Sequence, residues 1–226
     1  MEGATKPLPL NKHAMKTLKI VQDSCGSNPR EWDNLGTMAY KHSNYELGDE
    51  EIDDPIEWLE DMLNKERAYE YTSERLEKLE GEFYEKFIAL PLYLYDHSGI
   101  TINTTGFSCR WDSGKVGYIY MTKERFRSEC ARPMPLKEGQ INPKLNPIKR
   151  ITAKDLERAY EYLRGEVKTF DQYIRGDVYG FQIEDEDGNE IDSCYGFYGD
   201  DWENNGIKEH IDEELHPQLE TVEIEY

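Results

Sequence analysis

Three strand-like segments follow one another in the middle of the chain, and they limit the folds that it can adopt. Residues Phe87–Tyr95, FIALPLYLY, form a nearly continuous apolar run, whereas Ile100–Thr104 and Lys115–Met121 alternate apolar and polar side chains. Short stretches rich in Gly, Ser and Asp separate the three segments, as expected for turns between antiparallel strands. The sequence therefore predicts a β-meander, without the alternation of strands and helices that builds a doubly wound parallel sheet.

Helical patterns lie on both sides of this meander in the sequence. Apolar residues recur at helical spacing over residues 56–87, after Pro55 at a position where a first helical turn tolerates proline. We expect two helices here, with a break around 71–73. The clearest helical pattern is Ala153–Gly176, which begins after the capping residue Thr152 and ends at a glycine.

The remaining strand signals complete the predicted fold. Leu18–Gln22 predicts a short strand, and Val178–Gly199 predicts a hairpin whose turn contains Asp187, Gly188 and Asn189. We therefore expect an α+β fold with an antiparallel β-meander sheet of about five or six strands and two or three helices packed on one face. The expected parts are a flexible segment over 1–17, a single α+β domain over 18–207 with a Pro-rich loop at 132–149, and an acidic helix and tail over 208–226.

The charge of the chain is strongly negative and unevenly distributed. The sequence has 47 acidic and 27 basic residues, a formal net charge of -20 at pH 7. Glu46–Glu85 contains 16 acids and 4 bases, Glu184–Glu225 contains 16 acids and 1 base, and the rest of the chain has a net charge of +7. This distribution argues against direct binding to nucleic acid or to an anionic membrane. It is typical of a protein that binds a basic partner, or of a solvated surface.

The first acidic tract is dense enough to imitate the backbone of a nucleic acid. Sixteen acids in Glu46–Glu85 correspond, in a helix, to about one charge per 3.8 Å, and one DNA strand presents a phosphate about every 3.4 Å. Arginines of a DNA-binding groove form bidentate hydrogen bonds with such carboxylates. The residues expected to bind a basic partner are Asp53, Asp54, Glu57, Glu60 and Asp61 at the start of the first helix, and Glu184, Asp185, Glu186 and Asp187 in the hairpin.

Residues of catalytic type gather in Asp96–Gly114, DHSGITINTTGFSCRWDSG. If strands of the meander pair, Asp112 and Ser113 approach His97, which leaves open a small hydrolase or a small-ligand or nucleotide-binding site around Asp96, His97, Asp112 and Ser113 at the edge of the sheet. The order of these residues is nevertheless that of turn, strand and turn, and no strand, tight turn and helix surrounds a serine. We therefore predict no catalytic residue and favour a binding protein over an enzyme.

Known metal and cofactor motifs are incomplete in this sequence. The hairpin is similar to a calcium-binding loop around Gly188, but Ile183 and Cys194 occupy the positions of its first and last ligands. Glu166 and Lys168 have the spacing found in many nucleases, yet they lie in a predicted helix. No glycine-rich phosphate-binding motif occurs, and the four cysteines lack the spacing of a metal site. We expect neither a metal nor a cofactor.

Four segments, Asn28–Met38, Pro91–Ile102, Phe107–Tyr120 and Phe170–Gly199, resemble those of a group of uncharacterised small acidic proteins encoded by bacteriophages and mobile elements of Gram-positive bacteria. The resemblance transfers no functional residue. It implies a context, because strongly acidic phage and plasmid products resemble in composition the anti-restriction and anti-CRISPR inhibitors, some of which imitate DNA.

Charge and context together predict a phage or mobile-element accessory protein that binds and inhibits a host DNA-binding or defence enzyme through a DNA-mimicking acidic surface. A homodimer is left open, as is a nucleotide-sequestering oligomer that uses Lys144, Lys149 and Arg150. No apolar run approaches the length of a membrane span, and residues 1–17 lack the apolar centre of a secretory signal. We therefore expect a location in the bacterial cytoplasm.

Overall fold

The structure is a computed structural model that describes residues 16–68, 71–130, 132–133, 145–146 and 148–225. The fold is α+β, as predicted. The chain divides into two compact units: unit 1 joins Met1–Gly26 to Gly176–Tyr226, and unit 2 is the intervening segment Ser27–Arg175. The single domain expected over 18–207 is therefore wrong, because the predicted strand at 18–22 pairs with the C-terminal hairpin and not with the strands in the middle of the chain. The predicted flexible segment 1–17 and Pro-rich loop 132–149 lie largely outside the described residues.

Unit 2 is built on a five-stranded sheet that contains the three predicted central strands. The strands occur in the order β3 (Glu50–Glu51), β2 (Thr37–Tyr40), β6 (Ser113–Met121), β4 (Ile88–Asp96) and β5 (Ile100–Asn103). The three central strands do not form the predicted meander, because β4 lies between β5 and β6 and pairs with both. Neighbours pair antiparallel except β2 and β3, which are parallel, so the sheet is mixed. The short strands β7 (Arg132–Pro133) and β8 (Leu145–Asn146) form a separate antiparallel pair.

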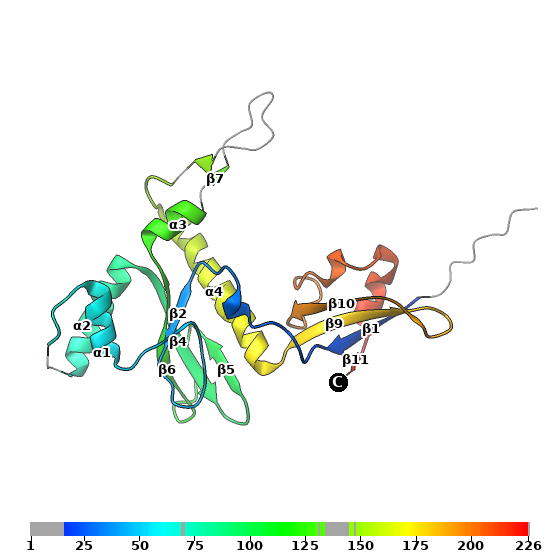
Figure 1. Ribbon diagram of the computed structural model, residues 1–226, viewed down its shortest axis with the longest axis horizontal. Helices are drawn as coiled ribbons and strands as arrows, with labels where there is room; N and C mark the ends of the chain where they lie inside the picture. The colour runs from blue at the N-terminus through cyan, green and yellow to red at the C-terminus, as the bar shows by residue number, and fades with distance from the viewer. Residues whose placement is uncertain (1–15, 69–70, 131, 134–144, 147, 226) are drawn as a thin grey trace, which may run out of the picture. The chain divides into compact units, whose positions relative to one another are not determined.

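Helices cover both faces of this sheet, in contrast to the single covered face that we predicted. Helices α1 (Pro55–Leu63) and α2 (Ser73–Lys86) pack on one face around Phe83 and Tyr118, and α4 (Ala153–Arg175) packs on the other around Leu163 and Ile119 (Figure 1). The physical reason is visible in β4, whose nearly continuous apolar run is typical of a strand buried on both sides. Helix α3 (Lys123–Glu129) and a 3-10 helix, η1 (Pro29–Glu31), complete the unit.

Capping residues set the boundaries of the first two helices. Helix α1 begins at Pro55. It ends before the capping residue Asn64, which adopts a left-handed conformation with φ of 55°. The Thr72 side chain then accepts a hydrogen bond from the amide of Arg75 and caps α2. The second helix thus begins within the predicted break around 71–73, but the first helix ends at Leu63, well before that break.

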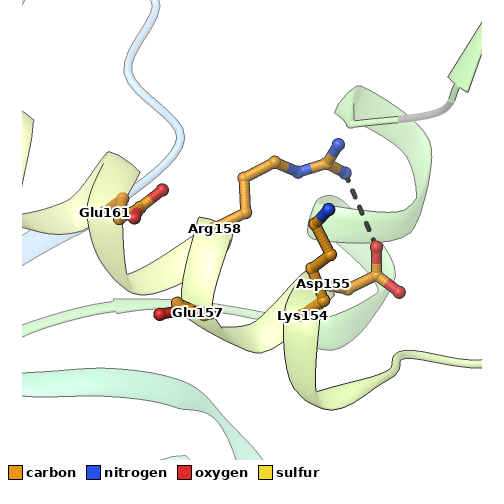
Figure 2. A pocket seen from close by; sticks show the side chains of 5 residues that line it. All are labelled: Lys154, Asp155, Glu157, Arg158 and Glu161. Carbon is orange, nitrogen blue, oxygen red and sulfur yellow. Dashed lines mark ion pairs between the residues drawn. The ribbon is translucent and has the colours of Figure 1, made fainter.

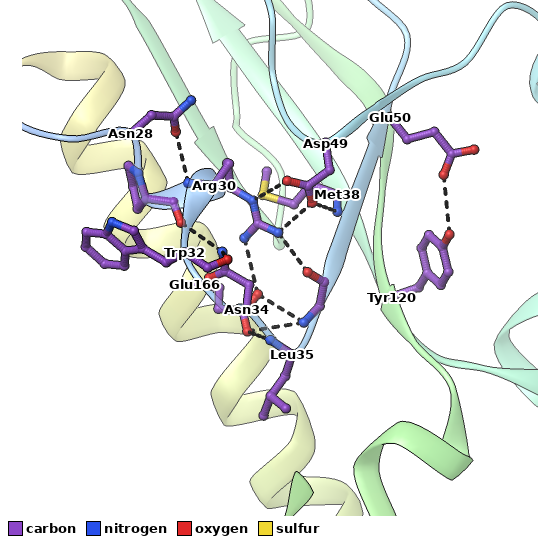
Figure 3. Close-up of polar contacts among 12 residues, drawn as sticks. Asn28, Arg30, Trp32, Asn34, Leu35, Met38, Asp49, Glu50, Tyr120 and Glu166 are labelled. Atoms are coloured by element: carbon purple, nitrogen blue, oxygen red, sulfur yellow. Dashed lines mark hydrogen bonds and ion pairs between the residues drawn. The ribbon is translucent and has the colours of Figure 1, made fainter. Parts of the chain in front are cut away.

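Arg30 is the centre of a polar network that joins three parts of unit 2 (Figure 3). Its side chain is only 4% exposed, and its guanidinium donates to both carboxylate oxygens of Asp49, at 2.6 and 3.0 Å. It also donates to Glu166 of α4 at 3.2 Å and to the carbonyl of Gly36 at 2.7 Å. Glu166 in turn accepts from the amide of Gly36 at 3.1 Å. Glu166 therefore fastens α4 to the segment before β2, which is a structural role.

Unit 1 is a four-stranded sheet with a layer of 3-10 helices on one face. The strands occur in the order β10 (Glu190–Tyr198), β9 (Val178–Glu184), β1 (Thr17–Gln22) and β11 (Ile224–Glu225). The helices η2 (Ile207–Glu209) and η3 (Glu213–Glu220) bury Ile207, Leu215 and Leu219 against Ile20 and Phe181 of the sheet. The segment expected to form a separate helix and tail over 208–226 therefore belongs to the core of unit 1. It forms 3-10 turns and an edge strand, and Pro217 lies inside η3.

The predicted hairpin turn between β9 and β10 is confirmed. Gly188 has a φ of +79°, a left-handed conformation that favours glycine. The Asp185 carboxylate accepts hydrogen bonds from the amides of Asp187 and Asn189, each at 2.9 Å. The main role of the Asp185 carboxylate is therefore to close the turn.

Candidate partner-binding surfaces

The five acids predicted as binding residues on α1 have very different environments. Asp54 caps the helix, since its carboxylate accepts from the amides of Ile56 at 2.9 Å and Glu57 at 3.1 Å. Asp53 is exposed, and its backbone carbonyl accepts from the Lys41 ammonium. The Asp53 carboxylate itself has no partner among the described residues.

Arg67 neutralises two further acids of this set. Its guanidinium donates to Glu57 at 2.6 Å and to Asp61 at 2.9 Å. The hydroxyl of Tyr71 also donates to Glu57, at 2.7 Å. These carboxylates are therefore already compensated on the surface, and a partner's cation would have to compete with Arg67.

Glu60 does not belong to an exposed acidic surface, so its predicted contact with a partner is corrected. Its side chain is 0% exposed, and it forms an ion pair with Arg75 of α2. Its two carboxylate oxygens also accept from the amide of Ala68 at 3.3 Å. Glu60 lies on the side of α1 that faces α2, where it joins the two helices.

The four predicted acids of the hairpin are also only partly available. Glu184 forms an ion pair with Lys19 at 2.9 Å. Hydrogen bonds from the backbone and side chain of Asn189 hold the pKa of Asp185 below its usual range, in keeping with its place in the turn. Glu186 and Asp187 are exposed at the centre of the turn.

The negative charge is concentrated in unit 1. Its 77 residues contain 19 acids and 5 bases, a net charge of -14, whereas the 149 residues of unit 2 contain 28 acids and 22 bases, a net charge of -6. The three bases in the described part of unit 1, Lys16, Lys19 and Lys208, all form ion pairs with acids of the same unit. No described cation of unit 1 is thus left to offset the remaining carboxylates.

Four available acids of unit 1 lie on the η2–η3 layer and the segment that follows it. They are exposed, and their carboxylates form no hydrogen bond or ion pair with a described residue. We call them the unit-1 acidic surface: Glu209, Glu213, Glu220 and Glu223. Sequence reasoning missed these four residues, although the near absence of bases after Glu184 was a usable signal.

The alternative site at the edge of the sheet brings only some of its residues together. The Nδ1 atom of His97 lies 3.7 Å from Oδ2 of Asp112, and the same oxygen accepts from the Cys109 thiol at 3.3 Å. The hydroxyl of Ser113 donates to the Cys109 carbonyl. The backbone amide of Asp96 donates to the Asp112 carbonyl at 2.8 Å. The serine is therefore not paired with a base, and Ser113 is not placed as a nucleophile activated by His97.

A hollow of about 430 Å³ lies along the first turns of α4 (Figure 2). Asp155 is buried there, and its carboxylate accepts from the amide and the hydroxyl of Thr152 at 3.0 and 2.7 Å. Arg158 lies 3.9 Å from Asp155 and donates to the Cys130 carbonyl at 3.2 Å. These groups cap α4 and attach it to α3. The exposed Lys149 and Arg150 precede the helix, and Lys144 lies outside the described residues.

Three general findings bear on the remaining expectations. Within the described part of the chain, His, Cys, Asp and Glu side chains form no group of three that could hold a metal ion. The described helices include none with the length and apolar character needed to cross a membrane. Comparisons with protein-family models, with curated proteins and with solved structures found no match to this chain.

Proposed function

We propose that the protein is a stoichiometric inhibitor whose unit 1 occupies the basic, DNA-binding surface of another protein. The observation that carries this proposal is the net charge of -14 on a compact unit of 77 residues in which the described bases are already paired. Carboxylates on a folded surface are held in position before binding. They can therefore replace DNA phosphates as the partners of arginines in a groove, with little loss of conformational entropy.

The proposed target is a host DNA-handling or defence enzyme. Surfaces that bind DNA are among the most basic in a cell, and complementary charge accelerates encounter with them. The resemblance to acidic proteins of bacteriophages and mobile elements supports a role against restriction or CRISPR systems. The proposal moves the main binding surface from α1, where we first expected it, to the unit-1 acidic surface.

The experiment compares two variants with the same change in charge. The first replaces the four residues of the unit-1 acidic surface with glutamine. The control replaces four exposed glutamates of unit 2 whose carboxylates likewise form no hydrogen bond or ion pair with a described residue: Glu66, Glu74, Glu77 and Glu85. Both variants change the net charge from -20 to -16. Tagged chains capture proteins from a Gram-positive bacterial lysate, and each captured protein is purified for binding measurements.

The captured target should bind the first variant at least about tenfold more weakly than the unaltered chain and bind the control almost unchanged. Duplex DNA should displace the unaltered chain from the target. Equal weakening by both variants would show that only total charge matters. A stable complex of chain, target and DNA would refute occupation of the DNA-binding surface.

A further inference from the structure

Trp111 is the most exposed large apolar side chain in the described part of the molecule. Its side chain is 96% exposed, whereas Trp32 is 46% exposed. Trp111 lies in the loop between β5 and β6 of unit 2. Exposed tryptophan is uncommon on a monomer and is strongly enriched among residues that dominate protein interfaces.

The loop that carries Trp111 is held in place by its own hydrogen bonds. At its start, Oδ1 of Asn103 accepts from the amides of Thr105 at 3.0 Å and Gly106 at 2.7 Å. At its end, the Cys109 thiol donates to Asp112 at 3.3 Å, and Asp112 is joined through its carbonyl to the Asp96 amide of β4. The indole is therefore displayed by an ordered loop, which reduces the entropy lost on binding.

Two hollows of opposite charge flank the beginning of β6. One, of about 430 Å³, is lined by Arg110, Lys115 and aromatic side chains. The other, of about 390 Å³, is lined by Trp111, by Asp96 and Asp112, and by apolar side chains of β4 and β6. Ser113 and Gly114 line both hollows and so form the ridge between them.

The two charged groups that face solvent most freely at this ridge are Arg110 and Asp96. Arg110 is exposed and forms no ion pair with a described residue, whereas Lys115 is held by Glu80 at 2.6 Å. Asp96 is exposed, and its carboxylate has only a long hydrogen bond of 3.4 Å from Tyr45. A free cation, a free anion and an exposed indole thus occur within one small patch.

We propose that this patch is a two-fold interface between two copies of the chain. In such an interface the same surface meets itself, so each residue contacts a different residue of the other copy in two symmetric places. Rotation about an axis through the ridge brings Arg110 of each copy to Asp96 of the other. The same rotation places each Trp111, which lines the acidic hollow, over the other copy's basic hollow, where Tyr93 and Phe107 provide aromatic surface.

Charge complementarity favours a second copy over other occupants. A basic partner of the kind proposed for unit 1 would be repelled by Arg110, and a nucleic acid would be repelled by Asp96 and Asp112. The patch is small, and the chain is strongly negative, so the two copies must overcome their mutual repulsion. We therefore expect a weak dimer, with a dissociation constant on the order of 10 to 100 µM at moderate salt.

Sedimentation equilibrium of the full chain tests this interface at concentrations from about 1 µM to 1 mM. The unaltered chain should form a dimer as concentration rises. Trp111→Ala should remain a monomer, and Trp32→Ala should dimerise like the unaltered chain. A dimer that survives Trp111→Ala, or an unaltered chain that stays monomeric throughout, would overturn the proposal.

A mixing experiment tests the charge pairing independently of Trp111. Arg110→Glu and Asp96→Lys should each remain monomeric alone, because each places like charges opposite one another twice. An equimolar mixture should form a heterodimer, because Glu at 110 then meets Lys at 96 in one place and the native pair forms in the other. Circular dichroism checks that both variants are folded. Folded variants that do not associate on mixing would contradict the pairing.

A fluorescence titration distinguishes the alternative occupant. Trp111 emission is compared with and without a short oligothymidylate, because bases stack on exposed indoles in proteins that bind single-stranded nucleic acid. We expect the oligothymidylate to cause no change in emission that depends on Trp111. Quenching that depends on Trp111 would assign the patch to nucleic acid and refute the dimer interface. The outcome is independent of the function proposed for unit 1, which uses other residues.

Discussion

At the scale of single residues, neighbouring acids with the same sequence appearance have opposite roles. Glu60 is buried in an ion pair with Arg75, while the next residue, Asp61, pairs with Arg67 at an exposed surface. A charge count treats the two alike, because the count contains no information about which side of a helix meets another helix. The identity of the buried acid depends on Arg75, fifteen residues away in sequence.

Replacing these two acids separately should give very different stabilities. Glu60→Ala leaves the partly buried Arg75 without its partner and the Ala68 amide without its acceptor, so we expect a loss of about 2 to 4 kcal/mol in the free energy of unfolding. Asp61→Ala removes an exposed pair and should cost less than about 1 kcal/mol. Urea denaturation followed by circular dichroism measures both. Similar losses for the two variants would contradict the burial of Glu60.

Buried tyrosines on the α1–α2 side of the sheet should make the protein less stable in alkali. Burial, together with the neighbouring Glu50, raises the pKa of Tyr120 to about 12, and burial also raises the pKa values of Tyr84 and Tyr118. An unfolded tyrosine has a pKa of about 10. The folded state therefore retains protons that the unfolded state releases, so stability is complete below pH 10 and falls as the pH rises toward 12.

Absorbance at 295 nm during an alkaline titration measures this effect. We expect a first group of tyrosines to ionise while the chain is folded and a second group to ionise only near pH 12 or on unfolding. Tyr120→Phe should reduce the amplitude of the second group. Ionisation of all tyrosines in one phase near pH 10, with the circular dichroism of the folded state retained, would disprove the expected pKa shifts.

At the scale of elements, local patterns predicted most helices and strands, and pairing partners were harder to infer. The three central strands, the start of α2 and the turn at Gly188 follow from apolar periodicity and from residues that cap helices or close turns. The order β6-β4-β5, in which β4 replaces β5 as the central strand of the three, does not follow from them. The placement of β1 beside β9 and β11 depends on contacts between the two ends of the chain, which no local pattern records. For the partner-binding surface, the sequence indicated the excess of negative charge. It did not indicate which acids already form ion pairs within the chain.

The close approach of β2 and β6 depends on a glycine in β6. A Cβ atom at Gly117 would lie 2.0 Å from the carbonyl oxygen of Ala39 in β2, whereas a Cβ atom at Gly114 in the same strand would meet nothing within 4 Å. Gly117→Ala should therefore force the strands apart and cost about 3 kcal/mol or more. Gly114→Ala, the matched control, should cost less than about 1 kcal/mol. Urea midpoints that coincide would show that β2 adjusts freely.

At the scale of the whole molecule, the two units differ most in charge. Because unit 1 carries a net charge of -14 in 77 residues, its carboxylates repel one another within a small volume. Added salt screens this repulsion, with a Debye length of about 10 Å at 0.1 M. Unit 2 has a much lower charge density and should respond less.

Amide hydrogen exchange measures the response of each unit separately. Between about 20 and 300 mM sodium chloride, protection of the amides in β1 and β9 should rise more than protection of those in β4 and β6. The variant with glutamine at Glu209, Glu213, Glu220 and Glu223 should show a smaller salt effect in unit 1. An equal effect of salt on both units would mean that repulsion within unit 1 does not limit its stability.

The position of β1 between two C-terminal strands also has a consequence for protein synthesis. Strand β1 is synthesised before all of unit 2, but its neighbours β9 and β11 are complete only at Glu184 and Glu225. All strands of the five-stranded sheet lie between Thr37 and Met121. Each strand of that sheet therefore has its pairing partner before β9 and β11 are synthesised. Unit 1 is therefore assembled last, and a translation product that stops before Glu225 lacks one edge of its sheet. A product that stops before Val178 leaves β1 without either neighbour, so proteases should cleave it there while the strands of unit 2 are already paired.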